Sequence, residues 1–560
     1  MANLEHAVKH SKGIDIHCDG EVVFTKLTYE NYIRCMQYSN TGKYILYCDS
    51  VDTVLLNADD KTIIKSLPLP KIQNAIFSPK DTYVVTWEPY VIYGRPKPGE
   101  AERKPNPNLR FWRCDTGENL LITSCGRDMI WQPQWTADES VCLRLVGSEL
   151  MVIKDEKFDR NCFKKVFKNI GCFKVSPGEA PLVAFYQKDS GNEPGRCEIR
   201  RIDKDFSLLS QRTIFKSDKA VLKWNSKGNA VLCTAISEVD ASNKNYYGEQ
   251  SLYLVTLQSD SSMKVTLDKE GPIYNAEWNP QGNEFAVCYG FMPSRVTVFN
   301  MRGDKAWKIK DDHINEIYYN PFGNILVVCG FSNIAAGTME FYDTTKKEMI
   351  SHLERPNTTA FTWAPDGQHF INATCAPRMR QDNSYTISHY TGKQICNVAF
   401  ETGHEVWGVQ FKQATPSKQK VFTIEKGSTK IVPKKAGAVH VVDKLIDQGI
   451  ISTASKSAYI PPHLRKKTAE TATGDAPKAK GGLTQKGEKK RTTSSSSSND
   501  AIKNENSKIL FRLQKKVNDI LAIKEKFDKG ETLQDNQIVK LSKLDAVTED
   551  LENFKLSIAA

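Results

Sequence analysis

The most regular pattern in this chain is a short phrase in which an aromatic residue precedes a tight turn and a run of apolar residues. Five copies share one spacing from the aromatic to a glycine: YSNTG at 38–42, WNSKG at 224–228, WNPQG at 278–282, YNPFG at 319–323 and WAPDG at 363–367. Proline sets a negative φ, Asn or Asp bonds back to the main chain, and glycine accepts a positive φ. The phrase therefore predicts a hairpin corner, and the apolar stretches that follow, such as 284–288 and 325–329, are expected strands.

Weaker copies extend this repeat over the first three quarters of the chain. Three looser copies begin at Phe77, Trp135 and Val175, and a ninth, around 409–411, lacks the turn residues. A single sheet cannot bury both of its faces, so neighbouring sheets must stack, with the aromatic of each phrase between them. A period of about 40 to 50 residues is that of propeller blades.

The repeat thus predicts an all-β propeller of WD-like repeats over residues 1–430. Nine phrases favour nine blades, although eight blades or a seven-plus-two split stay open. Residues 109–117 and 339–344 carry an aromatic, Asp and Thr order that we expect in the last strand of a WD-type blade.

Cysteine usage and the first residues of the chain indicate the cellular compartment in which the protein works. All 14 cysteines lie between Cys18 and Cys396, with no C-x-x-C pair and no histidine at metal-ligand spacing, so we expect buried, reduced thiols and no metal. The first residues lack the features of a signal peptide, and no apolar run has the length of a membrane span. These features favour a cytoplasmic protein without a membrane partner.

Charge separates the predicted propeller from the rest of the chain. Of the net charge of +11, residues 1–430 carry 53 basic and 50 acidic side chains, and residues 431–560 carry 24 and 16, which leaves +8 on the tail. A near-neutral propeller with a basic tail favours an acidic partner such as RNA, although a solvated basic linker has the same composition.

The tail divides into three segments. Residues 431–465 are expected to be extended and contain YIPPHLR at 459–465, where Tyr459, Pro461, Pro462 and Leu464 are candidates for a partner's groove; a stiff spacer is the alternative. Residues 466–500 form a basic linker rich in Ser and Lys that we expect to be disordered. The candidate contacts to phosphate in these two segments are Arg465, Lys466, Lys467, Lys486, Lys489, Lys490 and Arg491.

Residues 501–560 predict a C-terminal helical hairpin. Leu510, Leu513 and Val517 begin one apolar stripe, Leu541 and Leu544 begin a second, and a glycine at 530 separates the two. A solvated coil or a homodimeric coiled coil is the alternative. The candidate RNA contacts on the first helix are Arg512, Lys515 and Lys516.

A long insertion rich in proline interrupts the propeller pattern at 93–108. Loops of this length are uncommon without a function, and Arg95, Lys97, Arg103, Lys104 and Arg110 are candidates to contact phosphate; a surface loop without a function is the alternative. No P-loop, dinucleotide fingerprint, nucleophile elbow or zinc-protease motif occurs in the chain. We therefore expect no enzyme activity and no cofactor, although a propeller hydrolase with a dispersed site remains a weaker possibility.

The order of these parts resembles the eukaryotic translation initiation factor 2A family. The resemblance rests on GRPKP at 94–98 leading to NLRFW at 108–112, on AYIPPHLR at 458–465, and on the basic helix that ends near the glycine at 530. It covers essentially the whole chain, and it implies a nine-bladed propeller.

The resemblance also implies a function. A member of this family would direct initiator methionyl-tRNA to the small (40S) ribosomal subunit, dependent on the start codon and not on GTP, for a subset of mRNAs. The implied partners are that subunit, the tRNA, mRNA and, through the propeller, other initiation factors. The alternative is a protein-only scaffold, because the large subunit of initiation factor 3 carries a similar propeller.

Overall fold

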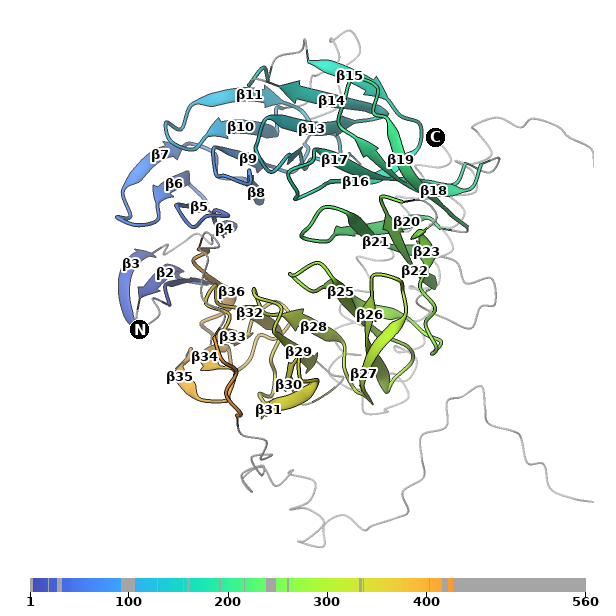
Figure 1. Cartoon of the computed structure of the whole chain (residues 1–560). Helices are drawn as coiled ribbons and strands as arrows, with labels where there is room; N and C mark the ends of the chain where they lie inside the picture. Colours follow the sequence, from blue (N-terminus) through green and yellow to red (C-terminus); the bar gives the residue numbers. More distant parts are fainter. Residues whose placement is uncertain are drawn as a thin grey trace, which may run out of the picture. The chain divides into compact units, whose positions relative to one another are not determined.

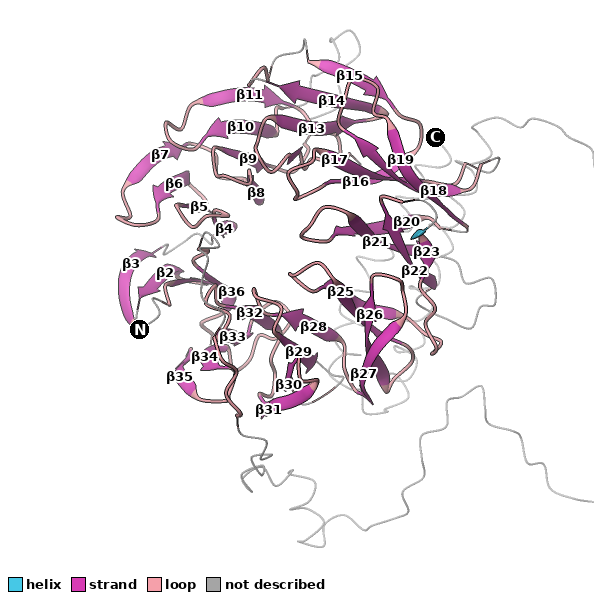
Figure 2. Cartoon of the chain, viewed as in Figure 1, coloured by secondary structure: helices cyan, strands magenta, loops and turns pink. Residues whose placement is uncertain are grey.

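The structure is a computed structural model that describes residues 4–427, apart from 19, 28–32, 92–105, 128, 155, 159–161, 191–192, 216, 238–247, 259–260, 332–334, 336, 402 and 415–421. These residues form nine four-stranded antiparallel sheets arranged as the blades of a ring (Figure 1). Apart from a short helical turn at residue 261, strands account for the regular structure of the described residues (Figure 2). The predictions for residues 431–560, including the helical hairpin, lie outside the described residues.

Each of the first eight blades is a meander of four consecutive strands. Blade 1 consists of β4 (Cys35–Tyr38), β5 (Tyr44–Cys48), β6 (Thr53–Asn57) and β7 (Ile63–Leu67), and blade 2 of β8 (Asn74–Phe77), β9 (Tyr83–Trp87), β10 (Leu109–Arg113) and β11 (Asn119–Thr123). Blade 3 consists of β12 (Gln134–Trp135), β13 (Val141–Val146), β14 (Glu149–Lys154) and β15 (Phe163–Val166), and blade 4 of β16 (Ile170–Val175), β17 (Leu182–Gln187), β18 (Gly195–Arg201) and β19 (Leu208–Ile214).

The other blades continue in the same order until the last one. Blade 5 consists of β20 (Lys219–Trp224), β21 (Ala230–Ser237), β22 (Glu249–Thr256) and β23 (Met263–Lys264), and blade 6 of β24 (Ile273–Trp278), β25 (Glu284–Tyr289), β26 (Ser294–Asn300) and β27 (Lys305–Asp312). Blade 7 consists of β28 (Glu316–Tyr319), β29 (Ile325–Gly330), β30 (Thr338–Asp343) and β31 (Glu348–Glu354), and blade 8 of β32 (Ala360–Trp363), β33 (His369–Thr374), β34 (Ser384–His389) and β35 (Gln394–Ala399). Blade 9 combines β36 (Val406–Phe411) with β1 (His6–His10), β2 (Gly13–Cys18) and β3 (Glu21–Leu27).

The nine sequence phrases mark the nine blades. Every phrase coincides with the end of the first strand of a blade, from Tyr38 at the end of β4 to Phe411 at the end of β36. Figure 1 shows that first strands such as β4, β8 and β36 lie nearest the centre of the ring. The prediction of nine blades is confirmed, and the alternatives of eight blades and of a seven-plus-two split are wrong.

The ring closes by pairing the two ends of the propeller. β36 runs antiparallel to β1, with Phe411 opposite His6 and Val409 opposite Val8. The neighbour of β36 in its sheet is therefore β1, from the start of the chain, and not the next strand in the sequence. No hairpin turn is needed after the ninth phrase. This explains why the ninth phrase lacks turn residues.

One expectation about the outer strands is wrong. The segments at 109–117 and 339–344 contain β10 and β30, which are third strands, each followed by an outer strand in the same sheet. Asp343 marks a turn rather than the blade edge, because its Oδ1 accepts the main-chain NH groups of Thr345 (2.9 Å) and Lys346 (2.9 Å). The aromatic, Asp and Thr order thus begins the hairpin into the fourth strand.

The core consists of apolar layers between neighbouring blades. Trp278 packs with residues of blades 5 and 6, and its Nε1 donates to the carbonyl of Lys223 on the first strand of blade 5 (2.8 Å). Trp224 donates in the same way to Lys174 of blade 4 (2.8 Å). The aromatic of a phrase therefore joins its blade to the one before it, as expected.

The cysteines belong to this core. All 14 are free thiols, and 10 of them are buried. Burial raises the pKa of Cys35 to about 11, so the thiol stays protonated at neutral pH. The expectation of buried thiols thus holds for most of the set.

The antiparallel strands give the ring two distinct sides. Turns between first and second strands and between third and fourth strands emerge on one side, here called the turn face. Connections between second and third strands and the crossovers between blades emerge on the other side, here called the crossover face. The predicted functional segments attach to different faces, as described below.

Candidate functional site

The residues that sequence reasoning selected for RNA contact lie outside the described residues. Arg95, Lys97, Arg103 and Lys104 fall within 92–105, and the candidates from Tyr459 to Lys516 fall beyond 427. They stay predictions. What the structure does describe is the point where each of the two segments joins the propeller.

The insertion joins the crossover face of blade 2, and its expected contact Arg110 has a different role. The guanidinium of Arg110 donates to Glu88 Oε1 (3.1 Å) and to the carbonyl of Pro107 (3.0 Å), and its side chain is only 15% exposed. Asn108 Nδ2 bonds the carbonyls of Glu88 (3.0 Å) and Cys125 (3.0 Å). Arg110 is therefore committed to the base of the insertion, which corrects the prediction that it contacts phosphate.

The last described segment before the tail lies on the opposite side of the ring. After β36, residues 422–427, here called the strap, pack on the turn face of blades 7 and 8. The Phe422 ring lies 5.7 Å from Tyr390 and 6.0 Å from Phe322. The main-chain NH of Gly427 donates to Ile350 (3.1 Å), and that of Glu425 donates to the Tyr390 hydroxyl (2.9 Å). The strap thereby fixes where the basic tail begins.

On the turn face, asparagines of the sequence phrases link successive blades. Asn225 Nδ2 donates to the carbonyl of Gly282 (3.1 Å), Asn279 to Gly323 (3.1 Å) and Asn320 to Gly367 (3.0 Å). Each bond runs from one blade to the turn of the next. The sequence already carried the signal, since these three copies have Asn directly after the aromatic, but the partner became apparent only in the folded ring.

A charged cluster braces the seam where the ring closes. The buried carboxylate of Glu5 accepts from Lys61 Nζ (2.8 Å) and the Tyr38 hydroxyl (3.1 Å), and it lies 3.6 Å from Lys412 Nζ. Lys61 and Tyr38 belong to blade 1, whereas Lys412 follows β36. The cluster therefore ties the last strand and the N-terminal segment to the first blade.

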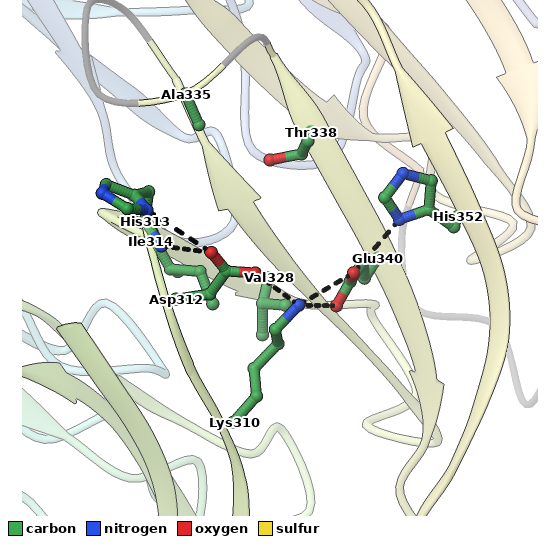
Figure 3. Close-up of a pocket in the computed structure, with 9 residues that line it drawn as sticks. All are labelled: Lys310, Asp312, His313, Ile314, Val328, Ala335, Thr338, Glu340 and His352. Carbon is green, nitrogen blue, oxygen red and sulfur yellow. Dashed lines mark hydrogen bonds and ion pairs between the residues drawn. The ribbon is translucent and has the colours of Figure 1, made fainter. Parts of the chain in front are cut away.

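A cavity lined by charged side chains lies between blades 6 and 7 and has a volume of about 240 Å³ (Figure 3). Lys310 Nζ lies 3.0 Å from both carboxylate oxygens of Glu340 and 2.7 Å from Asp312 Oδ2. Glu340 also accepts from Tyr342 (2.8 Å) and contacts His352 Nδ1 (3.1 Å).

These contacts set the charge state of the cavity. Burial acts to raise the pKa of Glu340, but the hydrogen bonds from Tyr342 and Lys310 outweigh it and hold that pKa below its usual value. Lys310 and Asp312 belong to blade 6 and Glu340 belongs to blade 7, so the ion pair between Lys310 and Glu340 works as a brace between the two blades. Among the residues that the structure describes, no group of three His, Cys, Asp or Glu side chains is placed to hold a metal ion.

The fold defines a closed nine-bladed β-propeller protein, in which the sequence insertion joins blade 2 at the crossover face and the strap before the basic tail packs on the turn face. A model of the family "Eukaryotic translation initiation factor eIF2A" matches residues 212–409. Eukaryotic translation initiation factor 2A of Caenorhabditis elegans is 39% identical over 99% of this chain and 100% of its own length. The chain belongs to the eukaryotic translation initiation factor 2A family, and its role therefore lies in translation initiation.

Two further comparisons agree with this assignment. Eukaryotic translation initiation factor 2A of Drosophila melanogaster is 31% identical over 77% of this chain and 66% of its own length. A solved structure described as a crystal structure of the eukaryotic initiation factor has a TM-score of 0.66 and 26% identity, covering 74% of this chain and all of that one. Among the described residues, no helix has the length and apolar character needed to cross a membrane.

Proposed function

We propose that this protein directs initiator methionyl-tRNA to the small (40S) ribosomal subunit, dependent on the start codon and not on GTP, for a subset of mRNAs. Family membership over 99% of the chain is the observation that carries the proposal. The named relatives are initiation factors, which supports a role without enzyme activity or a cofactor. The cytoplasm is the compartment where such a role is needed.

In this proposal the propeller is a rigid platform and the tail grips RNA. The charge distribution supports the division, because residues 431–560 carry +8 of the net charge. The strap supports it too, since its contacts with blades 7 and 8 give the tail a fixed origin on the turn face. A protein partner would be held near that RNA if it bound the propeller or the candidate groove-binding residues of the tail, which are Tyr459, Pro461, Pro462 and Leu464.

A grip based on phosphate contacts has a measurable salt dependence. Neutralising six to ten phosphates releases their counterions, so affinity for tRNA should fall by about 10³ to 10⁵ between 50 and 200 mM salt. Charge reversal in the full-length protein at Lys489, Lys490, Arg491, Lys515 and Lys516 should weaken binding and flatten this dependence. Unchanged binding would remove the tail from the proposal.

The deciding experiment measures binding of labelled initiator methionyl-tRNA to purified small subunits with an AUG message and no GTP. Full-length protein is compared with a truncation ending at Lys430, which keeps the whole strap. We expect the full-length protein to promote binding and the truncation to fail. Equal activity would assign the RNA contact to the propeller and its insertion, which includes Arg95 and Arg103. If neither protein acts, the protein-only scaffold becomes the better account.

A further inference from the structure

A second cavity lies at the seam where the ring closes, between the facing sheets of blades 8 and 9. Its volume is about 460 Å³, within the range of about 300 to 1,000 Å³ typical of ligand sites. Tyr385, Ile387 and Val398 of blade 8 form one wall, and His6 and His17 of blade 9 form the other. The two walls come from opposite ends of the propeller sequence.

The blade 9 wall is a stack of flat rings. His6 and His17 are paired across β1 and β2, and their ring centroids lie 5.1 Å apart at an interplanar angle of 7°. His6 is held in place through Nδ1 to the carbonyl of Leu4 (2.8 Å) and through Nε2 to the Tyr385 hydroxyl (3.2 Å). Burial lowers the pKa of His6 to about 4 and also lowers that of His17, so both rings are neutral at neutral pH.

The rim of the cavity combines a cation with an exposed apolar side chain. Lys393 lies at the rim, directly before β35, and Ile395 on β35 is 48% exposed. Flat neutral rings, apolar walls and a cationic rim together fit a planar ring that carries a negative group.

The end of the strap lies close to this rim. A Cβ at Gly427, the last residue of the strap, would lie 2.7 Å from the Cα of Thr391, which is in the same turn as Lys393. The last described residue before the basic tail therefore lies in contact with the turn that carries Lys393. A polyanion held by the tail would be presented to the rim.

We propose that this cavity binds one base of single-stranded RNA, stacked on His17, with the adjoining phosphate at Lys393. Stacking on aromatic rings next to a cationic track is how proteins bind single strands without reading sequence. An aromatic side chain of a protein partner would fill the same walls but would leave Lys393 without a role. The inference rests on the proposed function, because it assumes that the tail holds RNA.

Photo-cross-linking of the full-length protein to a 12-nucleotide single-stranded RNA containing 4-thiouridine tests this inference, with the linked peptides identified by mass spectrometry. We expect links within residues 6–18 and 385–398. Ile395→Trp should fill the mouth of the cavity, remove these links and weaken binding about fivefold to a hundredfold, as expected for the loss of one stacked base. Ile122→Trp, at a 53% exposed isoleucine on the outer strand of blade 2, is the matched control and should leave both unchanged.

A second pair of variants guards against misfolding of the tryptophan variant. Lys393→Glu should weaken binding and reduce the same links, whereas Lys204→Glu, at an exposed turn of blade 4, should not. Links confined to residues beyond 427 would overturn the cavity site and leave the proposed RNA grip of the tail intact. Absence of any RNA binding would overturn both. Links that persist in Ile395→Trp would also reject the base-binding site. So would a result in which Ile395→Trp loses a protein partner but keeps its binding to RNA.

Discussion

Replacing Gly323 with alanine should break one of the bonds that join the blades on the turn face. Gly323 has a φ of +73°, and a Cβ built there would overlap Oδ1 of Asn279 from the preceding blade. Asn279 is held in place, because its Oδ1 accepts from the main chain of Gln281 (2.9 Å) and its Nδ2 donates to Glu284 (3.0 Å). The asparagine therefore moves only by giving up hydrogen bonds.

The magnitude follows from two separate costs. A side chain at positive φ costs roughly 1–2 kcal/mol. Displacing Asn279 from the carbonyl of Gly323 leaves buried polar groups unpaired, at roughly 1–3 kcal/mol. We therefore expect Gly323→Ala to lower the free energy of unfolding by about 2–5 kcal/mol.

The assay is urea unfolding followed by tryptophan fluorescence, with Gly147→Ala as the matched control. Gly147 has a φ of +62°, but its Cβ would meet nothing within 4 Å, so the control carries the conformational cost alone. The difference between the two variants, about 1–3 kcal/mol, then measures the contact between blades. In an Asn279→Ala background, Gly323→Ala should cost no more than Gly147→Ala does. Equal losses in both single variants would refute the reasoning.

Three further predictions concern the seam and the strap. Glu5→Gln should lower the free energy of unfolding by about 3 kcal/mol, measured by urea unfolding, because Lys61 loses its buried partner; an unchanged midpoint would contradict this. Burial lowers the pKa of folded His6 to about 4, below the value of about 6.5 for a histidine in the unfolded chain. Its contribution of about 3 kcal/mol to the free energy of unfolding is therefore present above pH 6.5 and lost as the pH falls toward 4. His6→Gln should flatten the pH dependence of thermal unfolding, and an equally steep profile would reject this assignment. Phe422→Ala should speed hydrogen exchange at the amide of Gly427 about tenfold, since the strap loses its stack on Tyr390, whereas exchange in the blade cores should not change.

Local chemistry made the blade architecture readable from the sequence. Turn residues act over four or five positions, so an aromatic, Asn or Pro, and Gly in that order specify a strand end wherever they occur. This is why each of the five regular copies marks the end of a first strand, from Tyr38 in β4 to Trp363 in β32. The same reasoning misplaced β10 and β30 by one strand, because an aromatic and Asp describe a turn without saying how many strands precede it.

The candidate sites were less readable. Arg110 looked like a free cation beside other basic residues, and only the folded blade places Glu88 against it. Net charge counts side chains along the chain, but a salt bridge depends on which strands are neighbours. The basic residues of the tail still rest on composition and on resemblance to the family.

The sequence by itself determined the repeat of nine phrases, the propeller class, the change of composition near residue 430 and the resemblance to a translation factor family, because each depends on residues close together along the chain. The choice of nine blades in one ring over the alternatives needed the structure. Tertiary structure alone decided how the ring closes, which glycine each asparagine meets and where cavities remain. His6 and Tyr385 form a hydrogen bond between the two walls of the cavity at the seam, although 379 positions separate them in the sequence. The physical reason is that closure and cavity shape depend on how rigid sheets pack against each other, and packing joins residues without regard to their distance in sequence.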